Sequence, residues 1–263
     1  MTWTIQQAID TIIASVPGAP FADTVDTVKA GDSSQELTGI VVTFLVTRNV
    51  IEQAARRGAN LIITHEPTFY NHPDETEWLR AHPVYAAKRR WIEEHGVVIW
   101  RFHDYLHSIP PDRAFMGLTQ ELKWEANGTP EHPYICSIPP MSLLELGNWV
   151  KDKLGIQTIR MVGDLTLRCE RVALLPGFPP ATWQMGSLGE AGADVLIAGE
   201  IHEWEVSEYV RDASDFGHKK GLIVIGHAAS EEPGMRLIVP WLQERLPGVD
   251  IEFVSSGNPF HYM

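Results

Sequence analysis

Histidine and carboxylate side chains follow four short apolar runs of this sequence. The four groups are His65 with Glu66, His103 with Asp104 and His107, Glu200 with His202, and His227 with Glu231. Imidazole nitrogens and carboxylate oxygens bind divalent transition metals, and the same groups move protons in catalysis. Four such groups, each just after an apolar run, predict one metal site that holds more than one ion.

The apolar runs indicate the elements that position these side chains. They cover residues 59–63, 97–100, 195–199 and 222–226, and turn residues bound them. Continuous apolar runs of this kind are typical of buried strands in a mostly parallel sheet. In open α/β sheets, functional sites form beyond the carboxyl ends of the strands. Helices are predicted for the segments 5–14, 49–57, 83–95, 142–154, 181–191, 203–211 and 230–246.

The alternation of strands and helices begins again after a proline-rich stretch at 128–140. Ser142 and Glu145 form a capping-box pattern at the start of a helix, and Gly155 is a typical residue for its end. We therefore predict an α/β fold of two related halves with mixed, mostly parallel sheets. The halves are expected at residues 1–125 and 126–263, packed as one compact unit with the metal site between them.

The composition limits the classes of partner. The formal net charge is −13, which gives no general attraction to nucleic acid or to an anionic membrane. Cys136 and Cys169 are the only cysteines, too few for a disulfide framework. The N-terminal residues lack the pattern of a signal peptide, and no apolar stretch approaches the roughly 20 residues of a membrane span. We expect a cytoplasmic protein with a small-molecule substrate of unknown identity.

Two of the groups have structural interpretations besides metal binding. His227 and Glu231 are four residues apart at a helix start, so both side chains can lie on one face. Alternatively, Ser230 caps that helix and Glu231 offsets its dipole. The alternative for His65 and Glu66 is a simple turn after a strand.

The other candidates also have two interpretations. His107 is either a metal ligand or a surface histidine. His103 and its neighbour Asp104 are ligands or groups that orient a ligand. Glu200 and His202 are candidates for the general base or for the pocket wall, and the alternative is an exposed helix start.

Several segments resemble one protein family. Residues 58–69, GANLIITHEPTF, resemble the segment GADLIITHHPLFF of the Nif-three-like dinuclear metal-centre proteins, often described as GTP cyclohydrolase I type 2 homologues. Residues 46–54, 193–202, 226–231 and 258–260 resemble that family's DVTxxVIEEA, ADAYITGDIKYH, GHYASE and NPF. The resemblance runs in order through nearly the whole chain and fits the short form of the family.

The resemblance also implies a set of metal ligands. The family uses three histidines and two carboxylates, and the corresponding residues here are His65, Glu66, His107, His227 and Glu231. One histidine has become a carboxylate and one carboxylate a histidine, so the number of each is kept. The resemblance therefore implies two divalent transition-metal ions, Zn, Fe or Mn. The family's glycine-rich turn is replaced by residues 177–180, GFPP, which indicates a different substrate pocket.

Two functions of different classes remain. The first is a metal-dependent hydrolase of cyclohydrolase or amidohydrolase type, in which Glu200, His202 or His103 moves protons. The second is a non-catalytic metal-binding regulatory or adaptor protein. A third possibility is a divergent member without metals, but the paired exchange of ligands argues against it. The resemblance further implies a ring-like homo-oligomer, such as a hexamer.

Overall fold

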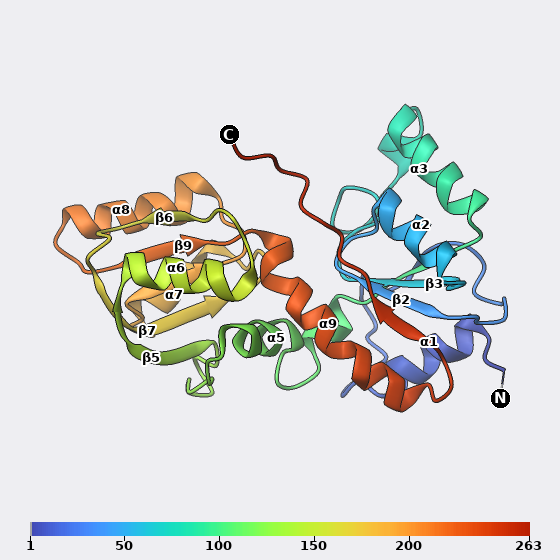
Figure 1. The fold of residues 1–263 in the computed structure, drawn as a ribbon, viewed down its shortest axis with the longest axis horizontal. Helices are drawn as coiled ribbons and strands as arrows, with labels where there is room; N and C mark the ends of the chain where they lie inside the picture. Colours follow the sequence, from blue (N-terminus) through green and yellow to red (C-terminus); the bar gives the residue numbers. More distant parts are fainter. Residues whose placement is uncertain (1) are drawn as a thin grey trace. The chain divides into compact units, whose positions relative to one another are not determined.

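The computed structural model describes residues 2–263 (Figure 1). The chain forms two compact units. Unit 1 comprises the chain up to Arg113 together with Met235–Asn258, and unit 2 comprises Ala114–Gly234 with Pro259–Met263. This division differs from the predicted halves, which were residues 1–125 and 126–263. The reason is a long-range pairing, because strand β10 (Ile251–Phe253) pairs in parallel with β2 (Ile40–Thr43) and so belongs to the first sheet.

Unit 1 contains a five-stranded sheet of order β1-β4-β3-β2-β10. Besides β2 and β10, its strands are β1 (Val28–Ala30), β3 (Leu61–Thr64) and β4 (Val98–Arg101). Only β1 is antiparallel to its neighbour. All residues of β2, β3 and β4 are buried. Burial on both faces explains why these strands are continuous apolar runs in the sequence.

Helices cover the sheet of unit 1. They are α1 (Ile5–Ala14), α2 (Arg48–Arg56), α3 (Pro83–Glu94) and the short α4 (Asp104–His107), with a 3-10 turn η1 (Glu77–Leu79). Helices α2 and α3 pack on one face of the sheet, where Ile51 and Ile92 join Val41, Ile62 and Ile99 in one apolar cluster. This packing fixes the carboxyl ends of β3 and β4, where the first two groups of candidate residues begin.

Unit 2 contains a second five-stranded sheet, of order β5-β7-β8-β9-β6. Its strands are β5 (Ile135–Ser142), β6 (Arg160–Val162), β7 (Arg168–Leu175), β8 (Val195–Ala198) and β9 (Gly221–Val224). The central strands β7, β8 and β9 are parallel, and the two edge strands are antiparallel. The predicted α/β fold with two mixed sheets is confirmed.

The helices of unit 2 follow local signals in the sequence. They are α5 (Arg113–Leu122), α6 (Leu143–Leu154), α7 (Ala181–Gly189), a π-helical turn η2 (Glu203–Ser207), α8 (Glu208–Asp215) and α9 (His227–Arg245), which continues into unit 1. At α6 the predicted capping box of Ser142 and Glu145 is present, and Gly155 ends the helix in the left-handed conformation with φ 64°.

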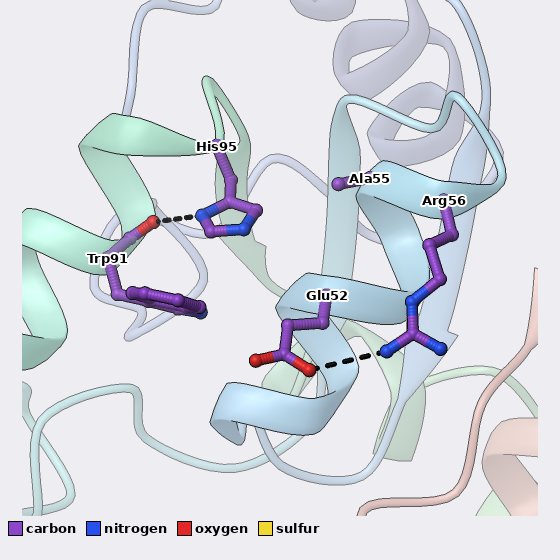
Figure 2. A pocket seen from close by; sticks show the side chains of 5 residues that line it. All are labelled: Glu52, Ala55, Arg56, Trp91 and His95. Atoms are coloured by element: carbon purple, nitrogen blue, oxygen red, sulfur yellow. Dashed lines mark hydrogen bonds and ion pairs between the residues drawn. The ribbon is translucent and has the colours of Figure 1, made fainter.

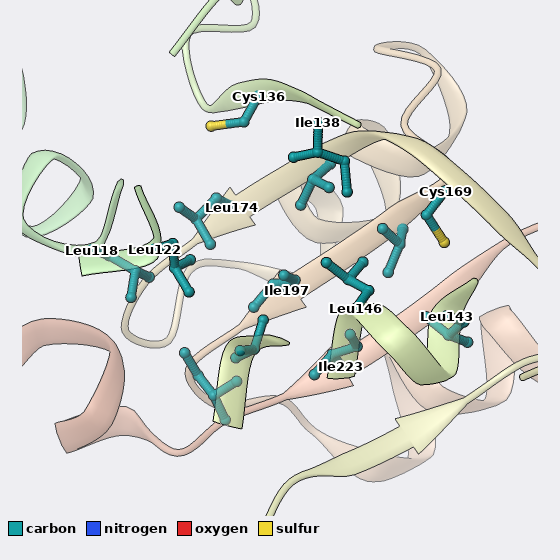
Figure 3. Packing of buried hydrophobic residues seen from close by; sticks show 14 of the residues in the cluster. Leu118, Leu122, Cys136, Ile138, Leu143, Leu146, Cys169, Leu174, Ile197 and Ile223 are labelled. Carbon is teal, nitrogen blue, oxygen red and sulfur yellow. The ribbon is translucent and has the colours of Figure 1, made fainter. Parts of the chain in front are cut away.

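Alternate residues of one strand face the two layers of unit 2. Val195 and Ile197 of β8 pack with side chains of α5 and α6, and Figure 3 shows Ile197 among Leu118, Leu122 and Leu146. Leu196 of the same strand packs instead with side chains of α7 and α8. Both faces of the sheet are therefore covered, as the period of two residues along a strand requires. Among the residues that the structure describes, no helix has the length and apolarity to cross a bilayer.

Candidate metal centre

Three histidines of unit 1 form one cluster. His65 follows β3, whereas His103 and His107 lie at the two ends of α4 after β4. One ring nitrogen from each lies within 4.8 Å of the others. The ring centroids are 4.7 Å apart for His65 and His103, 5.1 Å for His65 and His107, and 5.0 Å for His103 and His107. We call these three residues the triple-histidine cluster, and its nitrogens suit a divalent transition-metal ion.

An oxygen acceptor fixes each ring of the cluster through its Nδ1 atom. The contacts are 3.3 Å from His65 to the carbonyl oxygen of Phe102, 2.8 Å from His103 to Oδ1 of Asp104, and 2.9 Å from His107 to Oδ2 of Asp112. Carbonyl and carboxylate oxygens accept hydrogen bonds, so each Nδ1 carries the proton and each Nε2 carries the lone pair. Metal-binding histidines have this arrangement.

Residues near the N-terminus hold α4 in place. Asp104 accepts hydrogen bonds from the Thr24 hydroxyl at 2.7 Å and from the Val25 N–H at 3.1 Å. Burial raises the pKa of Asp104, but these bonds and the one from His103 outweigh it and hold the pKa at about 2. The buried Asp26 accepts from the N–H groups of His103 at 2.7 Å and Tyr105 at 2.8 Å. Thr24, Asp26 and Asp112 could not be identified from the sequence, because they act on the site only through tertiary contacts.

The environment of His103 favours a neutral ring. Burial, together with the neighbouring rings of His65 and His107, lowers its pKa to about 4. A ring with this pKa offers its lone pair to a metal over the whole neutral pH range. The structure thus brings His103 together with the two histidines that the family resemblance implied as ligands.

Glu66 lies beside the cluster, as the sequence pattern suggested. Its Oε1 is 3.9 Å from Nε2 of His65, and its Oε2 is 3.9 Å from the fully buried guanidinium of Arg101. Arg101 ends β4 and compensates the negative charge of Glu66 in this largely buried setting. That Glu66 binds a metal stays a prediction.

Unit 2 brings together a second set of candidates. His227 begins α9, and its Nδ1 lies 3.0 Å from Oε2 of Glu200. Its Nε2 lies 3.1 Å from Oε2 of the buried Glu231, four residues along the helix. Glu200 is therefore placed to orient the ring of His227, and His227 and Glu231 present a nitrogen and an oxygen to the same point.

The prediction that Ser230 caps this helix is wrong. Helix α9 begins at His227, so Ser230 lies in its first turn and is not the N-cap. The Ser230 hydroxyl instead donates to the carbonyl of His227 at 2.6 Å and accepts from the N–H of Gly177 at 2.9 Å. Ser230 thereby connects the segment after β7 to the start of α9.

Gly177 lies against the His227–Glu231 pair. Its φ is 69°, and a Cβ atom at this position would lie 2.3 Å from Oε1 of Glu231 and 3.5 Å from Nε2 of His227. Glycine is required both by the backbone conformation and by the close approach. Gly177 therefore lets the segment after β7 lie directly against Glu231 and His227.

His202 has a different setting from the other candidates. Its ring is exposed, and its Nδ1 lies 2.9 Å from Oε2 of Glu205. It stacks on Trp204 with centroids 5.7 Å apart and meets the Phe178 ring at 4.8 Å. The imidazole–carboxylate pair with Glu205 suits proton transfer at an exposed position.

A surface groove in unit 1 lies between α2 and α3 and is lined by residues other than the predicted site residues. Glu52, Ala55 and Arg56 of α2 face Trp91 and His95 across a volume of about 520 Å³ (Figure 2). Glu52 pairs with Arg56 at 3.3 Å, and His95 contacts the carbonyl of Trp91 at 2.8 Å. The polar groups of this groove form hydrogen bonds with partners one turn away on the same helix, and we assign no chemistry to the groove.

Two mixed five-stranded sheets with histidines and carboxylates after their strands define an α/β protein with a candidate metal centre. The Duf34/NIF3 (NGG1p interacting factor 3) family model matches residues 9–259. The chain therefore belongs to this family, and the family predicted from the sequence motifs is confirmed.

Curated relatives of this chain are described as GTP cyclohydrolase 1 type 2 homologs. The chain is 27% identical to a GTP cyclohydrolase 1 type 2 homolog of Clostridium perfringens, over 89% of each chain. It is 24% identical to that of Escherichia coli K12, over 87% of this chain and 88% of the relative.

Solved structures match the fold over nearly the full length. Staphylococcus aureus protein SA1388 aligns with TM-score 0.79 and 20% identity, over 99% of both chains. A Bacillus cereus protein related to NIF3 aligns with TM-score 0.76 and 15% identity, over 100% of this chain and 99% of that one. Likeness at this level of identity shows the fold.

Proposed function

We propose that this chain is a dinuclear metal-dependent hydrolase. The observation that carries the proposal is the triple-histidine cluster, in which each Nδ1 faces an oxygen acceptor and each Nε2 carries a lone pair. Structural histidines have no common reason to adopt one tautomer around one point, whereas metal ligands do. The names of the relatives, which are GTP cyclohydrolase 1 type 2 homologs, support hydrolysis of a carbon–nitrogen bond in a ring.

The two sets of residues are proposed to hold two divalent ions of Zn, Fe or Mn. His65, Glu66, His103 and His107 supply one set, and His227 with Glu231 supplies the other. Glu66 and Glu231 contribute the negative charge that neutral imidazoles lack, which partly neutralises two divalent ions.

When bound, two divalent ions polarise a carbonyl or phosphoryl group and generate a water nucleophile at neutral pH. The residues of the chain hold the geometry around them. Asp104 and Asp112 fix the rings of His103 and His107, and Glu200 fixes the ring of His227. Glu200 and His103 were candidates for proton transfer, but their contacts now favour orientation and ligation. His202 with Glu205 is the remaining candidate for proton transfer.

A metal-binding regulatory protein is the competing function. An assay of cyclic amides and nucleotides separates the two, using metal-loaded protein, chelator-treated protein and the His202→Ala variant. The hydrolase proposal predicts turnover that chelation abolishes and that His202→Ala lowers with its metal content unchanged. Full metal occupancy with no turnover of any tested ring amide or phosphate ester would favour the regulatory function.

A further inference from the structure

A buried arginine fixes a fourth histidine at the edge of the triple-histidine cluster. Arg101 is 0% exposed and donates from Nε to the carbonyl of His65 at 3.1 Å. The same guanidinium donates from Nη1 to the carbonyl of His72 and contacts Nδ1 of His72 from Nη2 at 3.2 Å. One side chain thus joins a predicted metal ligand to His72, which the sequence analysis did not use.

The contact with Arg101 determines where the proton of His72 lies. A guanidinium has only donors, so Nδ1 of His72 must accept and must carry the lone pair. The ring is then neutral with its proton on Nε2. This is the opposite tautomer to that of His65, His103 and His107, whose Nδ1 atoms face acceptors. Three rings offer lone pairs, and one ring offers a hydrogen-bond donor.

The loop that carries His72 holds its ring against the cluster. The rings of His72 and His103 meet edge to face with centroids 5.0 Å apart, and His72 is exposed to solvent. Asp74 secures the loop by accepting from the N–H of Phe69 at 2.7 Å and by pairing with Arg101 at 3.9 Å. Tyr70 and Asp74 have positive φ angles of 71° and 58°, which non-glycine residues seldom adopt. Such conformations cluster at functional sites.

We infer that His72 is a substrate-binding residue beside the triple-histidine cluster. It donates its Nε2–H to an anionic oxygen of the substrate, from a carboxylate or a phosphate group. This inference rests on the proposed metal function. The chain carries a net charge of −13, so an anionic ligand needs a local source of attraction. The Arg101 guanidinium, which also pairs with Glu66 and Asp74, donates to Nδ1 of His72 and polarises the imidazole, which strengthens its Nε2–H as a donor. Selection of oxyanionic substrates follows from this arrangement.

The tautomer is tested first, in metal-free full-length protein. Nitrogen-15 labelling of the histidines and long-range proton–nitrogen NMR distinguish a protonated Nε2 from a protonated Nδ1. The His72→Phe variant assigns the signals of His72 by their disappearance. The expected result is a neutral His72 ring with its proton on Nε2. A proton on Nδ1 of His72 would overturn the inference whatever the metal content.

Binding is tested with Co²⁺-loaded protein titrated with inorganic phosphate and followed by the visible cobalt spectrum. His72→Phe keeps a flat ring but removes the donor, and His82→Phe is the control because His82 is exposed elsewhere in unit 1. We expect His72→Phe to keep its cobalt and to bind phosphate roughly 10-fold or more weakly, as for loss of a hydrogen bond to a charged group.

The outcomes separate this inference from the proposed function. Equal phosphate affinity in His72→Phe and wild type, or no phosphate binding at all, would overturn the role of His72 and leave the metal function standing. Loss of cobalt from His72→Phe would also overturn it, by making His72 a ligand or a structural residue. Failure of the wild type to take up cobalt would contradict the proposed function itself.

Discussion

Glu200 Oε2 lies 3.0 Å from Nδ1 of His227, the ring nitrogen opposite the one that faces Glu231. The three side chains form a row in which a carboxylate fixes an imidazole and the imidazole stands beside a second carboxylate. Glu200 comes from the segment after β8 and His227 from the segment after β9, two neighbouring parallel strands. The carboxyl ends of these strands therefore assemble this row.

Replacement of Glu200 tests its orienting role. Glu200→Gln removes the negative charge that holds the proton on Nδ1 of His227. Outer partners of metal-binding histidines typically contribute 10–100-fold to metal affinity, so we expect Zn²⁺ binding to weaken by about that factor. Calorimetric titration with Zn²⁺ measures it. Glu205→Gln, which changes the partner of His202, is the control with unchanged affinity. Equal affinity in Glu200→Gln and wild type would remove Glu200 from the site.

His103 is predicted to bind the metal itself and not only to orient another ligand. His103→Ala removes one of three nitrogens that lie within 4.8 Å of one another. We expect metal affinity to fall by more than the roughly 100-fold upper range for outer partners. Metal per chain after dialysis against a weak chelator is the measurement, with the melting temperature as a check of folding. If His103→Ala kept the metal content of His202→Ala, the triple-histidine assignment would be wrong.

Gly177 offers a matched pair of glycine variants. Gly177→Ala places a Cβ 2.3 Å from Oε1 of Glu231 at a φ of 69°, whereas Gly192→Ala meets nothing within 4 Å at a φ of 68°. Both variants pay the backbone cost, of order 1 kcal/mol. Only Gly177→Ala should displace Glu231 and lower metal affinity. Equal loss of metal in the two variants would show that the close approach is unimportant.

Lys88 gives a prediction for pH. Burial lowers its pKa to about 8 from the ordinary value of 10.5, and its Nζ donates to the carbonyl of Thr68 at 2.7 Å. Between these two values the unfolded chain holds a proton that the folded chain has released, so this group makes the free energy of unfolding rise with pH. Denaturant unfolding from pH 8 to 10.5 should show a shallower rise in Lys88→Met than in wild type. Lys219→Met, at an exposed position, is the control. An equally shallow rise of the free energy of unfolding with pH in Lys219→Met and Lys88→Met would refute the prediction.

The central strands and helix α6 could be predicted because residues within each element signal its type and its ends. Apolar runs gave the central strands, and Ser142, Glu145 and Gly155 gave both ends of α6. Helix α5 was missed, although Ala114, Phe115 and Leu118 repeat at helical spacing and are buried. The pairing of β10 with β2 was not predictable, because nothing in residues 251–253 identifies a partner some two hundred residues earlier.

The site was predictable as a list of side chains but not as a set of contacts. The motifs singled out His65, His107 and His227, whereas the roles of His103 and Glu200 depend on which oxygen each ring nitrogen faces. Nothing in the sequence singles out His72, because its relation to Arg101 arises from a buried guanidinium that joins two loops. Tautomers follow from tertiary partners, and single-sequence patterns do not contain them.

The central claim is that histidines and carboxylates of this chain hold two divalent transition-metal ions. Elemental mass spectrometry on protein purified without added metal or chelator, and again after reconstitution with Zn²⁺, Fe²⁺ or Mn²⁺, tests it directly. We expect about two metal ions per chain in the wild type and about one in the His227→Ala, Glu231→Ala double variant. Absence of bound metal in the wild type after reconstitution, or an unchanged content in the double variant, would contradict it.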